Sequence, residues 1–458
     1  MKTDLAEPLG PRDLVEKYSV PGPRYTSYPS VLDWGSLPPL EAWIASLKED
    51  LGRDSRAALY VHIPFCERRC TYCGCNTLIR PQHDGEETFV EQILVEWSLL
   101  KCHLRLGNIP LGEVHLGGGT PTYLAPENLE RLLAGILTGP HAGCQASIEV
   151  DPRVTTREHL AVLARFGFRR LSLGIQDFDP EVQRLAHREQ SASLVADLLA
   201  AARCLGFDGI NFDLIYGLPG QTPEGLMASL RTTLDLGPDR LAFYGYAHVP
   251  WVKAGQKGYR DERVPDAAAR LALHLAGRET ILRAGFQEIG MDHFARPEDG
   301  LARSLHEGRL HRNFMGYTET RAQPLLAIGP SAISECSLGF RQNERELSAW
   351  AKRLDAGELP AFRGHVHDPE DLLLREHILN VMTRFATDWE AASRRTPFLH
   401  GIEERLAPMV LDGLVEISGA RLEVTPRGRP FVRNVAMAFD ARLARRQVGT
   451  SFVHSKTV

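Results

Sequence analysis

Hydrophobic and polar positions alternate with a short period in six segments of the first half of the chain. These short apolar and β-branched runs predict strands at residues 57–64, 113–119, 146–152, 170–176, 210–219 and 239–249. Between them lie amphipathic stretches with helical spacing, such as residues 86–104, 155–167 and 191–206. Strands that alternate with helices predict a parallel sheet. The spacing favours a full or partial barrel over an open sheet, a choice that periodicity alone does not settle.

The pattern changes towards the C-terminus. Helices are expected at 266–286, 370–385 and 398–413, strand-and-turn pieces at 287–294 and 324–334, and a hairpin at 414–432, whereas residues 1–55 show few periodic elements. The fold class predicted is α/β, a partial (β/α)6-type barrel with additions at both ends. We expect an N-terminal extension (1–55), a barrel domain with its strand-and-turn extension (56–360), and a mainly helical C-terminal domain with a wing-like hairpin (361–458).

Composition excludes several classes of protein. The 458 residues are 43% hydrophobic and 24% charged, as in globular proteins. The net charge of −5 disfavours a nucleic-acid binder, and the helix expected at 398–413 is not basic. No apolar run is long enough to span a membrane, and the first ten residues lack the apolar core of a signal peptide. We therefore expect a cytoplasmic protein, a monomer, that binds no nucleic acid.

Four of the eight cysteines lie within ten residues of one another, at Cys66, Cys70, Cys73 and Cys75. A disulfide framework is not expected in a large chain without an export signal, so clustered thiols indicate a metal or cluster site. Structural zinc usually takes paired knuckles that close four ligands, whereas three ligands on a four-iron cluster leave one iron open. Cys75 is a conceivable fourth ligand, although a single residue between Cys73 and Cys75 makes it difficult for both thiols to bind the same tetrahedral metal ion. The isolated Cys102, Cys144, Cys204 and Cys336 are expected to be small buried hydrophobic residues.

A second motif and several strand ends carry further candidate chemistry. The run LGGGTP at 116–121 allows a backbone to approach a ligand closely, although an ordinary tight turn explains such a run nearly as well. Glu149 and Gln176 end expected strands and Asp213 lies in another. Barrel active sites form at such strand ends, where acids hold hydroxyl or ammonium groups.

The loop CERRCTYC (66–73) resembles the cluster loop of the radical S-adenosylmethionine (SAM) enzymes. From about residue 20 onward the chain is similar to the oxygen-independent coproporphyrinogen III oxidase family. The strings that carry this resemblance are RYTSYP (24–29), CGCN (73–76), SIEVDPR (147–153), GIQDFDPEVQRLAHREQ (174–190), IGMDHFARP (289–297) and HRNFMGYT (311–318). Haem-carrying relatives generally lack RYTSYP, the Cys of CGC and the QDF…REQ block, so their presence favours the enzyme.

The resemblance implies a set of cofactor contacts. Cys66, Cys70 and Cys73 would bind a [4Fe–4S] cluster, and Cys75 would be a catalytic thiol beside it that is not a ligand. Tyr60, Gly118, Glu149 and Ile333 match contacts to a cluster-bound SAM. Contacts to a second SAM are matched by Tyr72, Gly119, Thr120, Gln176, Arg188, Asp213 and Ala247. The last match is the least secure, because FYGYAHVP (243–250) has an extra glycine-containing step before Ala247.

The reaction implied by the family is oxidative decarboxylation of two propionates of coproporphyrinogen III to vinyl groups, in porphyrin and haem biosynthesis. Removal of an unactivated hydrogen atom from a propionate requires a radical. The four carboxylates of the substrate require cationic partners, and Arg24 and Arg312 are candidates for them. The electron donor and the final electron acceptor are not identified by the sequence. Two alternatives stay open: a haem-binding, chaperone-like relative without decarboxylase activity, and a radical SAM enzyme acting on a different tetrapyrrole.

Overall fold

A sheet of twelve strands organises the part of the chain that the computed structural model describes, which is residues 10–54, 56–138, 143–250, 255–256, 263–319, 321, 324–446 and 455–457. Six neighbouring strands run parallel, in chain order. They are β1 (Ala57–Ile63), β4 (Leu111–Gly118), β5 (Gln145–Val150), β6 (Phe168–Gln176), β7 (Gly209–Tyr216) and β8 (Arg240–Gly245). All six expected strands are confirmed.

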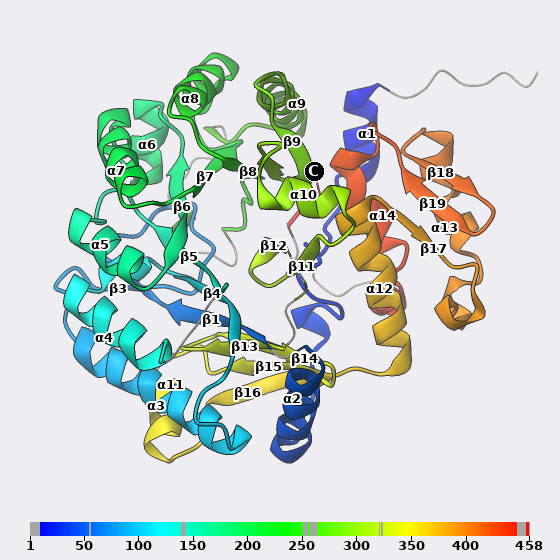
Figure 1. Cartoon of the computed structure of the whole chain (residues 1–458). Coiled ribbons are helices and arrows are strands. Elements are labelled where there is room, and N and C mark those ends of the chain that lie inside the picture. The colour runs from blue at the N-terminus through cyan, green and yellow to red at the C-terminus, as the bar shows by residue number, and fades with distance from the viewer. Residues whose placement is uncertain are drawn as a thin grey trace, which may run out of the picture.

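The sheet is extended at both edges by later parts of the chain. β13 (Leu325–Ile328) pairs in parallel with β1 on the side opposite β4. Beyond it lie three antiparallel strands, β14 (Ile333–Cys336), β15 (Gly339–Asn343) and β16 (Ala361–Val366). At the other edge β10 (His293–Ala295) and β9 (Gln287–Gly290) follow β8. The sheet curves into an open barrel with helices on its outer side (Figure 1).

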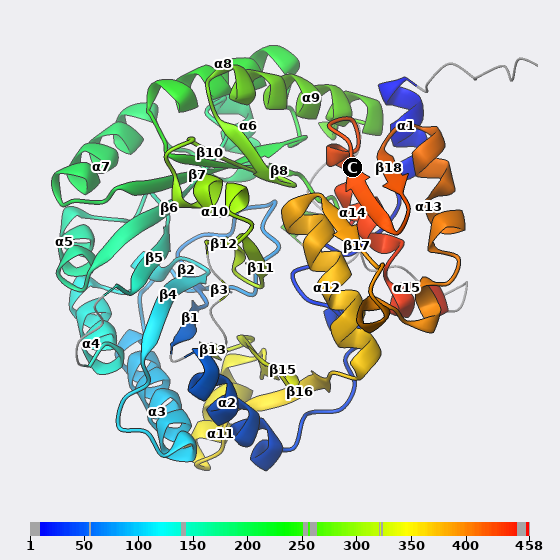
Figure 2. The same ribbon diagram turned by 45° about the vertical axis from the view of Figure 1, so that its right-hand side comes forward.

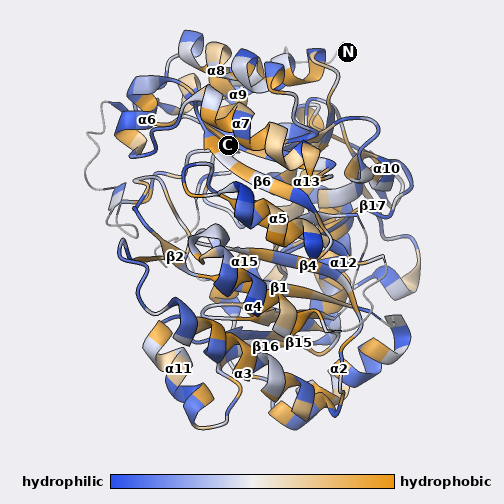
Figure 3. Cartoon of the chain, turned by 60° about the vertical axis from the view of Figure 1, so that its left-hand side comes forward, coloured by the Kyte–Doolittle hydropathy of each residue, from blue (hydrophilic) through white to orange (hydrophobic). Residues whose placement is uncertain are grey.

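The helices that cover the barrel follow the expected strand–helix alternation. They are α2 (Leu40–Asp54), α3 (Glu86–Leu104), α4 (Pro126–Ile136), α5 (Arg157–Arg165), α6 (Pro180–Ala186), α7 (Ala192–Cys204), α8 (Pro223–Asp235), α9 (Ala267–Arg283) and α11 (Leu347–Asp355). Side-chain caps determine where several begin: the Thr156 hydroxyl accepts the N–H of His159, and Asp179 caps α6. Apolar colour follows the strands and one face of each helix (Figure 3).

A second hydrophobic core joins the two ends of the chain. It includes Leu14 and Tyr25 from the N-terminal segment together with the C-terminal elements. Those elements are α12 (Pro369–Arg384), β17 (Ala386–Asp388), α13 (Ile402–Leu411), β18 (Val415–Ser418), β19 (Arg421–Val424), α14 (Val432–Met437) and α15 (Ala441–Arg445), with α1 (Pro11–Tyr18) beside them (Figure 2). The expected hairpin is therefore present as β18–β19.

Two expectations about single regions were wrong. Within the region 1–55, the described residues 10–54 contain two α-helices, α1 on the second core and α2 on the barrel core through Trp43 and Leu47. Of the four isolated cysteines only Cys336 is buried, while Cys102 and Cys204 are exposed on helices α3 and α7. A cysteine is small enough to occupy the outer face of a helix at little cost, which sequence spacing does not reveal.

The remaining short elements lie close to the barrel: β2 (Phe65–Cys66), β3 (Leu78–Ile79), α10 (Gly300–His306), β11 (His311–Asn313) and β12 (Gly316–Thr318). Among the described residues, no helix has the length and apolar character needed to cross a membrane. The expectation about a signal peptide rests on the first ten residues, of which 1–9 lie outside the described residues. The division of the chain into domains at residues 55 and 360 stays a prediction.

Candidate active site

A cavity of about 570 Å³ opens at the carboxyl ends of β4 to β7. It gathers twelve of the fifteen residues that were matched to the cluster, to the catalytic thiol or to SAM. These are Cys66, Cys70, Tyr72, Cys73, Cys75, Gly118, Gly119, Thr120, Glu149, Gln176, Arg188 and Asp213. The motifs come from five separate segments, so it is the barrel that brings them together.

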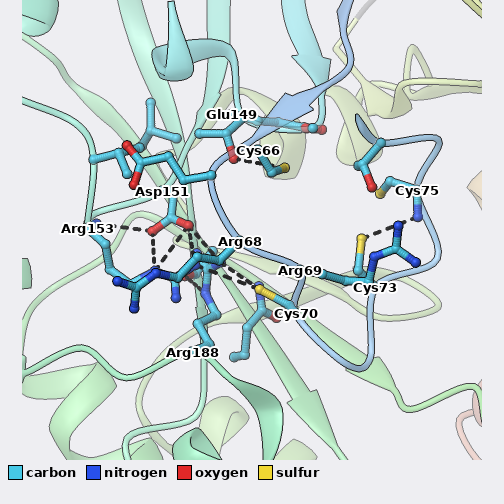
Figure 4. Close-up of a pocket in the computed structure, with 18 of the residues that line it drawn as sticks. Cys66, Arg68, Arg69, Cys70, Cys73, Cys75, Glu149, Asp151, Arg153 and Arg188 are labelled. Atoms are coloured by element: carbon cyan, nitrogen blue, oxygen red, sulfur yellow. Dashed lines mark hydrogen bonds and ion pairs between the residues drawn. The ribbon is translucent and has the colours of Figure 1, made fainter. Parts of the chain in front are cut away.

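Cys66 ends β2, and the other three clustered thiols lie on the loop between β2 and β3; all four residues line the cavity (Figure 4). The Sγ atom of Cys66 lies 3.4 Å from the Thr120 hydroxyl, and the Sγ atom of Cys73 accepts the backbone N–H of Cys75 at 3.4 Å. Within the described part of the chain, no group of three or more His, Cys, Asp or Glu side chains is arranged to ligate a single metal ion.

The glycine turn after β4 is bonded directly to this loop. Gly119 donates its N–H to the Ile63 carbonyl at 2.8 Å, and Thr120 donates to the Phe65 carbonyl at 2.8 Å. A Cβ atom on Gly119 would lie 2.6 Å from the carbonyl oxygens of both Pro64 and Phe65. Only glycine permits this approach, so the turn holds the start of the cysteine loop against the sheet.

A cationic group forms one side of the cavity. Asp151 accepts hydrogen bonds from Arg188 Nη1 at 2.9 Å and from Arg153 Nη2 at 2.7 Å (Figure 4). Arg188 also donates from Nε and Nη2 to the Gly174 carbonyl and from Nη1 to the Sγ atom of Cys70 at 3.6 Å. Although burial opposes it, the two guanidinium groups lower the pKa of Asp151. Two positive charges therefore face one carboxylate, which leaves a net positive charge beside the cavity.

An acidic group forms another side of the cavity. Glu149 accepts the N–H of Gly118 at 3.1 Å and lies 3.6 Å from His115, and Asp213 accepts hydrogen bonds from Ser172 and Asn211. Burial raises the pKa of Asp213 to about 6, and the neighbouring Glu149 carboxylate adds to the rise. Two carboxylates this close favour a cationic ligand between or beside them.

Gln176 ends β6 in a backbone conformation that is uncommon for a residue with a side chain, with φ of +68°. Its amide lies over Gly174, next to the guanidinium of Arg188. The hydrogen bonds from Arg188 to the Gly174 carbonyl hold Arg188 at the end of β6, beside Gln176.

Comparison with known proteins shows the family of the chain. Residues 60–233 match the model of the radical SAM superfamily. The oxygen-independent coproporphyrinogen III oxidase of Salmonella typhimurium is 39% identical, with 94% of this chain and 95% of the relative covered. That of Helicobacter pylori strain J99 is 36% identical, with 93% and 95% covered. The solved structure of coproporphyrinogen III oxidase from Escherichia coli, described as a radical SAM enzyme, superposes with a TM-score of 0.85 at 36% identity and covers 92% of this chain and 97% of its own.

The chain belongs to the oxygen-independent coproporphyrinogen III oxidase family. The family resemblance read from the motifs is thereby confirmed, as is the α/β fold class.

Three predicted contacts of this family member lie outside the 570 Å³ cavity. Tyr60 and Ile333 line an adjacent cavity of about 160 Å³. The Tyr60 hydroxyl donates to His62 Nδ1 at 3.0 Å, because His62 Nε2 donates to the Asn76 carbonyl at 3.0 Å. Ala247 lines a third cavity, of about 430 Å³, and its carbonyl accepts a hydrogen bond from Gln256.

The structure adds site residues that the sequence did not single out. Asp151 and Arg153 were part of the string SIEVDPR, yet no role followed from it, and Tyr244 also lines the cavity. The sequence did contain one indication of a role for Asp151, which is its position. It directly follows β5, at the edge of the sheet where the active sites of barrels form.

The two arginines predicted as partners of substrate carboxylates lie away from the thiols. Arg24 forms an ion pair with Asp292 and lines the cavity of Ala247. Arg312 is 3% exposed, stacks on Tyr317 and donates to the Arg24 carbonyl at 3.3 Å. Arg24 is therefore already compensated by a carboxylate, and Arg312 is closed off from solvent.

Proposed function

We propose that this protein catalyses the oxidative decarboxylation of two propionates of coproporphyrinogen III to vinyl groups, giving protoporphyrinogen IX in haem biosynthesis. The observation that carries the proposal is a single cavity at the strand ends. It is lined by three suitably spaced thiols, by the glycine turn, and by both acidic side chains and arginines. The chain is also 39% identical to an oxygen-independent coproporphyrinogen III oxidase. In each decarboxylation the substrate loses one hydrogen atom, CO2 and one further electron.

The residues present fit a [4Fe–4S] cluster with one open iron. Cys66, Cys70 and Cys73 are soft thiol ligands on one loop that faces one cavity, which is the donor chemistry such clusters require. A cluster held by these thiols would bind SAM at its open iron and would supply one electron, which would cleave the sulfonium to methionine and a 5′-deoxyadenosyl radical able to take a hydrogen atom from a propionate. The loop is fixed on both sides, through Gly119 and Thr120 at one end and through Arg188 at Cys70.

The charges of the cavity complement those of SAM, which carries a sulfonium, an ammonium and a carboxylate. Glu149 and Asp213 supply negative charge for the cationic groups, and the surplus positive charge of Arg153 and Arg188 suits the carboxylate. Tyr72, Gly119, Thr120 and Gln176 line the same cavity as these two groups of charges. This supports the finer proposal that two SAM molecules bind, one at the cluster and one at the Gln176–Arg188 side.

The protein positions the reactants and excludes water. The acidic and cationic groups stand on strand ends or on segments bonded to them, which limits their movement during the reaction. Exclusion of water protects a carbon radical from quenching and strengthens every charge contact inside the cavity.

The test is anaerobic incubation of the reconstituted protein with coproporphyrinogen III, SAM and a reductant, with identification of the porphyrin products. Formation of protoporphyrinogen IX by the wild type and its loss in Cys66→Ser support the proposal. Binding of haem without any vinyl product would overturn it in favour of a haem-carrying relative.

The number of SAM molecules is tested separately, by equilibrium binding of labelled SAM to the wild type and to Arg188→Ala. Two molecules per wild-type protein and one per variant are expected, because the SAM at the open iron does not depend on Arg188. Equal stoichiometry and affinity in both proteins would refute the two-SAM proposal.

A further inference from the structure

The cavity of about 430 Å³ that Ala247 and Arg24 line is separate from the cavity of the thiols, and the proposed function does not yet give it an occupant. It lies where the end of β8 and helix α9 meet α14 and residues 455–457. Helices α9 and α14, which both contribute lining residues, lie near one another in both views (Figures 1 and 2). Gln256 connects it to the 570 Å³ cavity, because its Nε2 donates both to the carbonyl of Ala247, which lines this cavity, at 3.0 Å and to the carbonyl of Tyr72, which lines the other, at 3.4 Å.

The described residues that line this cavity carry more positive than negative charge. The cations are Arg24, Arg270, Arg433 and Lys456, and the carboxylates are Asp266 and Asp292. Asp292 is committed to its ion pair with Arg24, and Asp266 caps α9 by accepting the N–H of Ala269 at 2.8 Å. Among the described residues, neither carboxylate forms an ion pair with Arg270, Arg433 or Lys456.

Arg433 contributes positive charge from within the protein. Its guanidinium donates only to backbone carbonyls, including Pro23 and Lys456 at 3.0 Å each, and it is 4% exposed. Burial lowers the pKa of Arg433 to about 9, and the like charge of Arg24 adds to the effect. The carbonyl groups solvate the Arg433 guanidinium but do not neutralise its charge. This positive charge would therefore attract and stabilise an anion bound in the cavity.

Arg270 is the cation best placed to meet a ligand. Its side chain has neither an ion pair nor a hydrogen bond with any residue that the structure describes, and its Nε atom is buried without a partner. The stem of Arg270 packs over Gly217, whose φ is +80° and on which a Cβ would lie 3.1 Å from Arg270 Cγ. On the same helix, His274 has a buried Nδ1 atom without a partner. A built cavity with an uncompensated arginine and orphaned donors points to an anionic ligand.

We propose that this cavity binds the carboxylates of the tetrapyrrole that are not decarboxylated, with Arg270 as their direct partner. The inference rests on the proposed function, in which two of four substrate carboxylates survive. The surviving propionates need cationic partners away from the reacting centre, and binding energy from such remote groups holds the reacting propionates in place. The hydrogen bonds of Gln256 link a residue that lines this cavity, Ala247, to a residue that lines the cavity of the thiols, Tyr72.

The carboxylate of SAM is the other source of the same chemistry. Of the residues that match contacts to a second SAM, only Ala247 lines this cavity, while Tyr72, Gly119, Thr120, Gln176, Arg188 and Asp213 line the other. The observations therefore favour the substrate here, and the experiment separates the two.

The experiment is anaerobic fluorescence titration of the reconstituted holoenzyme with coproporphyrin III, the stable oxidised form of the substrate. Arg270→Gln is compared with Arg270→Lys and with Arg283→Gln, a control on the same helix whose side chain is 78% exposed. We expect Arg270→Gln to weaken binding about 10- to 100-fold, the loss of one charge-assisted contact, and Arg270→Lys to recover most of the affinity. Arg283→Gln should bind like the wild type, and labelled SAM should bind equally to all four proteins.

Mesoporphyrin IX identifies which carboxylates are held, because it keeps the two surviving propionates and has ethyl groups where the reaction forms vinyls. Its affinity should fall by a similar factor in Arg270→Gln. The inference is overturned if coproporphyrin III binds Arg270→Gln as it binds the wild type, if only SAM binding is weakened, or if mesoporphyrin IX is unaffected. A wild type that makes no protoporphyrinogen IX would instead refute the proposed function.

Discussion

Replacement of Asp151 by Asn tests whether the cationic side of the active site depends on a single buried carboxylate. The side chain of Asp151 is 8% exposed, and those of its partners Arg153 and Arg188 are 19% and 9% exposed. In the wild type one carboxylate accepts from both guanidinium groups at 2.7–3.0 Å. Asparagine keeps the shape but removes the charge, and it turns an N–H₂ group towards one of the two donors.

The expected cost follows from this geometry. Removing one member of a buried ion pair usually costs about 3–5 kcal/mol, because a charge is left uncompensated. The substituted asparagine would keep one acceptor oxygen, and Arg188 would keep the Gly174 carbonyl. We therefore expect a loss at the lower end, about 3 kcal/mol in the free energy of unfolding.

Urea denaturation of the wild type and of Asp151→Asn, with Asp179→Asn as the control, measures this loss. Asp179 caps α6 through its side-chain oxygen, and Asn is an equally good cap, so the control should change by less than about 0.5 kcal/mol. The pKa of Asp151 lies below its ordinary value of 3.8, so its contribution is complete above that pH and is lost as the pH falls through the folded-state pKa. The difference between wild type and variant should shrink accordingly in acid. Equal stability of the two proteins at pH 7, or a difference that persists unchanged in acid, would refute the reasoning.

Three further predictions concern the cluster loop, the glycine turn and a buried acid. Serine in place of Cys66, Cys70 or Cys73, the proposed cluster ligands, should abolish the bound iron and the visible absorbance of the reconstituted protein. Cys75→Ser should retain both and lose turnover, and iron loss in Cys75→Ser would make Cys75 a ligand. Gly119→Ala should displace the turn and weaken SAM binding at least 10-fold, because its Cβ meets backbone oxygens at 2.6 Å, while Gly74→Ala, with open space around it, should bind SAM normally. Burial raises the pKa of Glu96 from 4.5 to about 7, so the folded state holds a proton that the unfolded state releases in this range. Thermal unfolding should show stability falling by at most about 3 kcal/mol as the pH rises through that window, and Glu96→Gln should lack this decline.

The strands and the chemistry of the cysteine loop were predictable because both are local in sequence. Alternation of apolar runs with amphipathic stretches predicts β1 and β4 to β8 with helices between them, since each βαβ unit folds from neighbouring residues. The spacing of Cys66, Cys70 and Cys73 likewise indicates a cluster site without reference to any other segment.

The partners of charged groups were decided by the tertiary structure. Nothing in the spacing of Arg24 shows that Asp292 neutralises it, nor that Arg270 has no such partner among the described residues, because charge compensation depends on which distant segments pack alongside. The same holds for β13, which adds to β1 from far along the chain, and for Leu14, whose apolar surface is buried by the C-terminal helices. Local periodicity tells which face of an element must be covered, whereas only the folded chain determines what covers it.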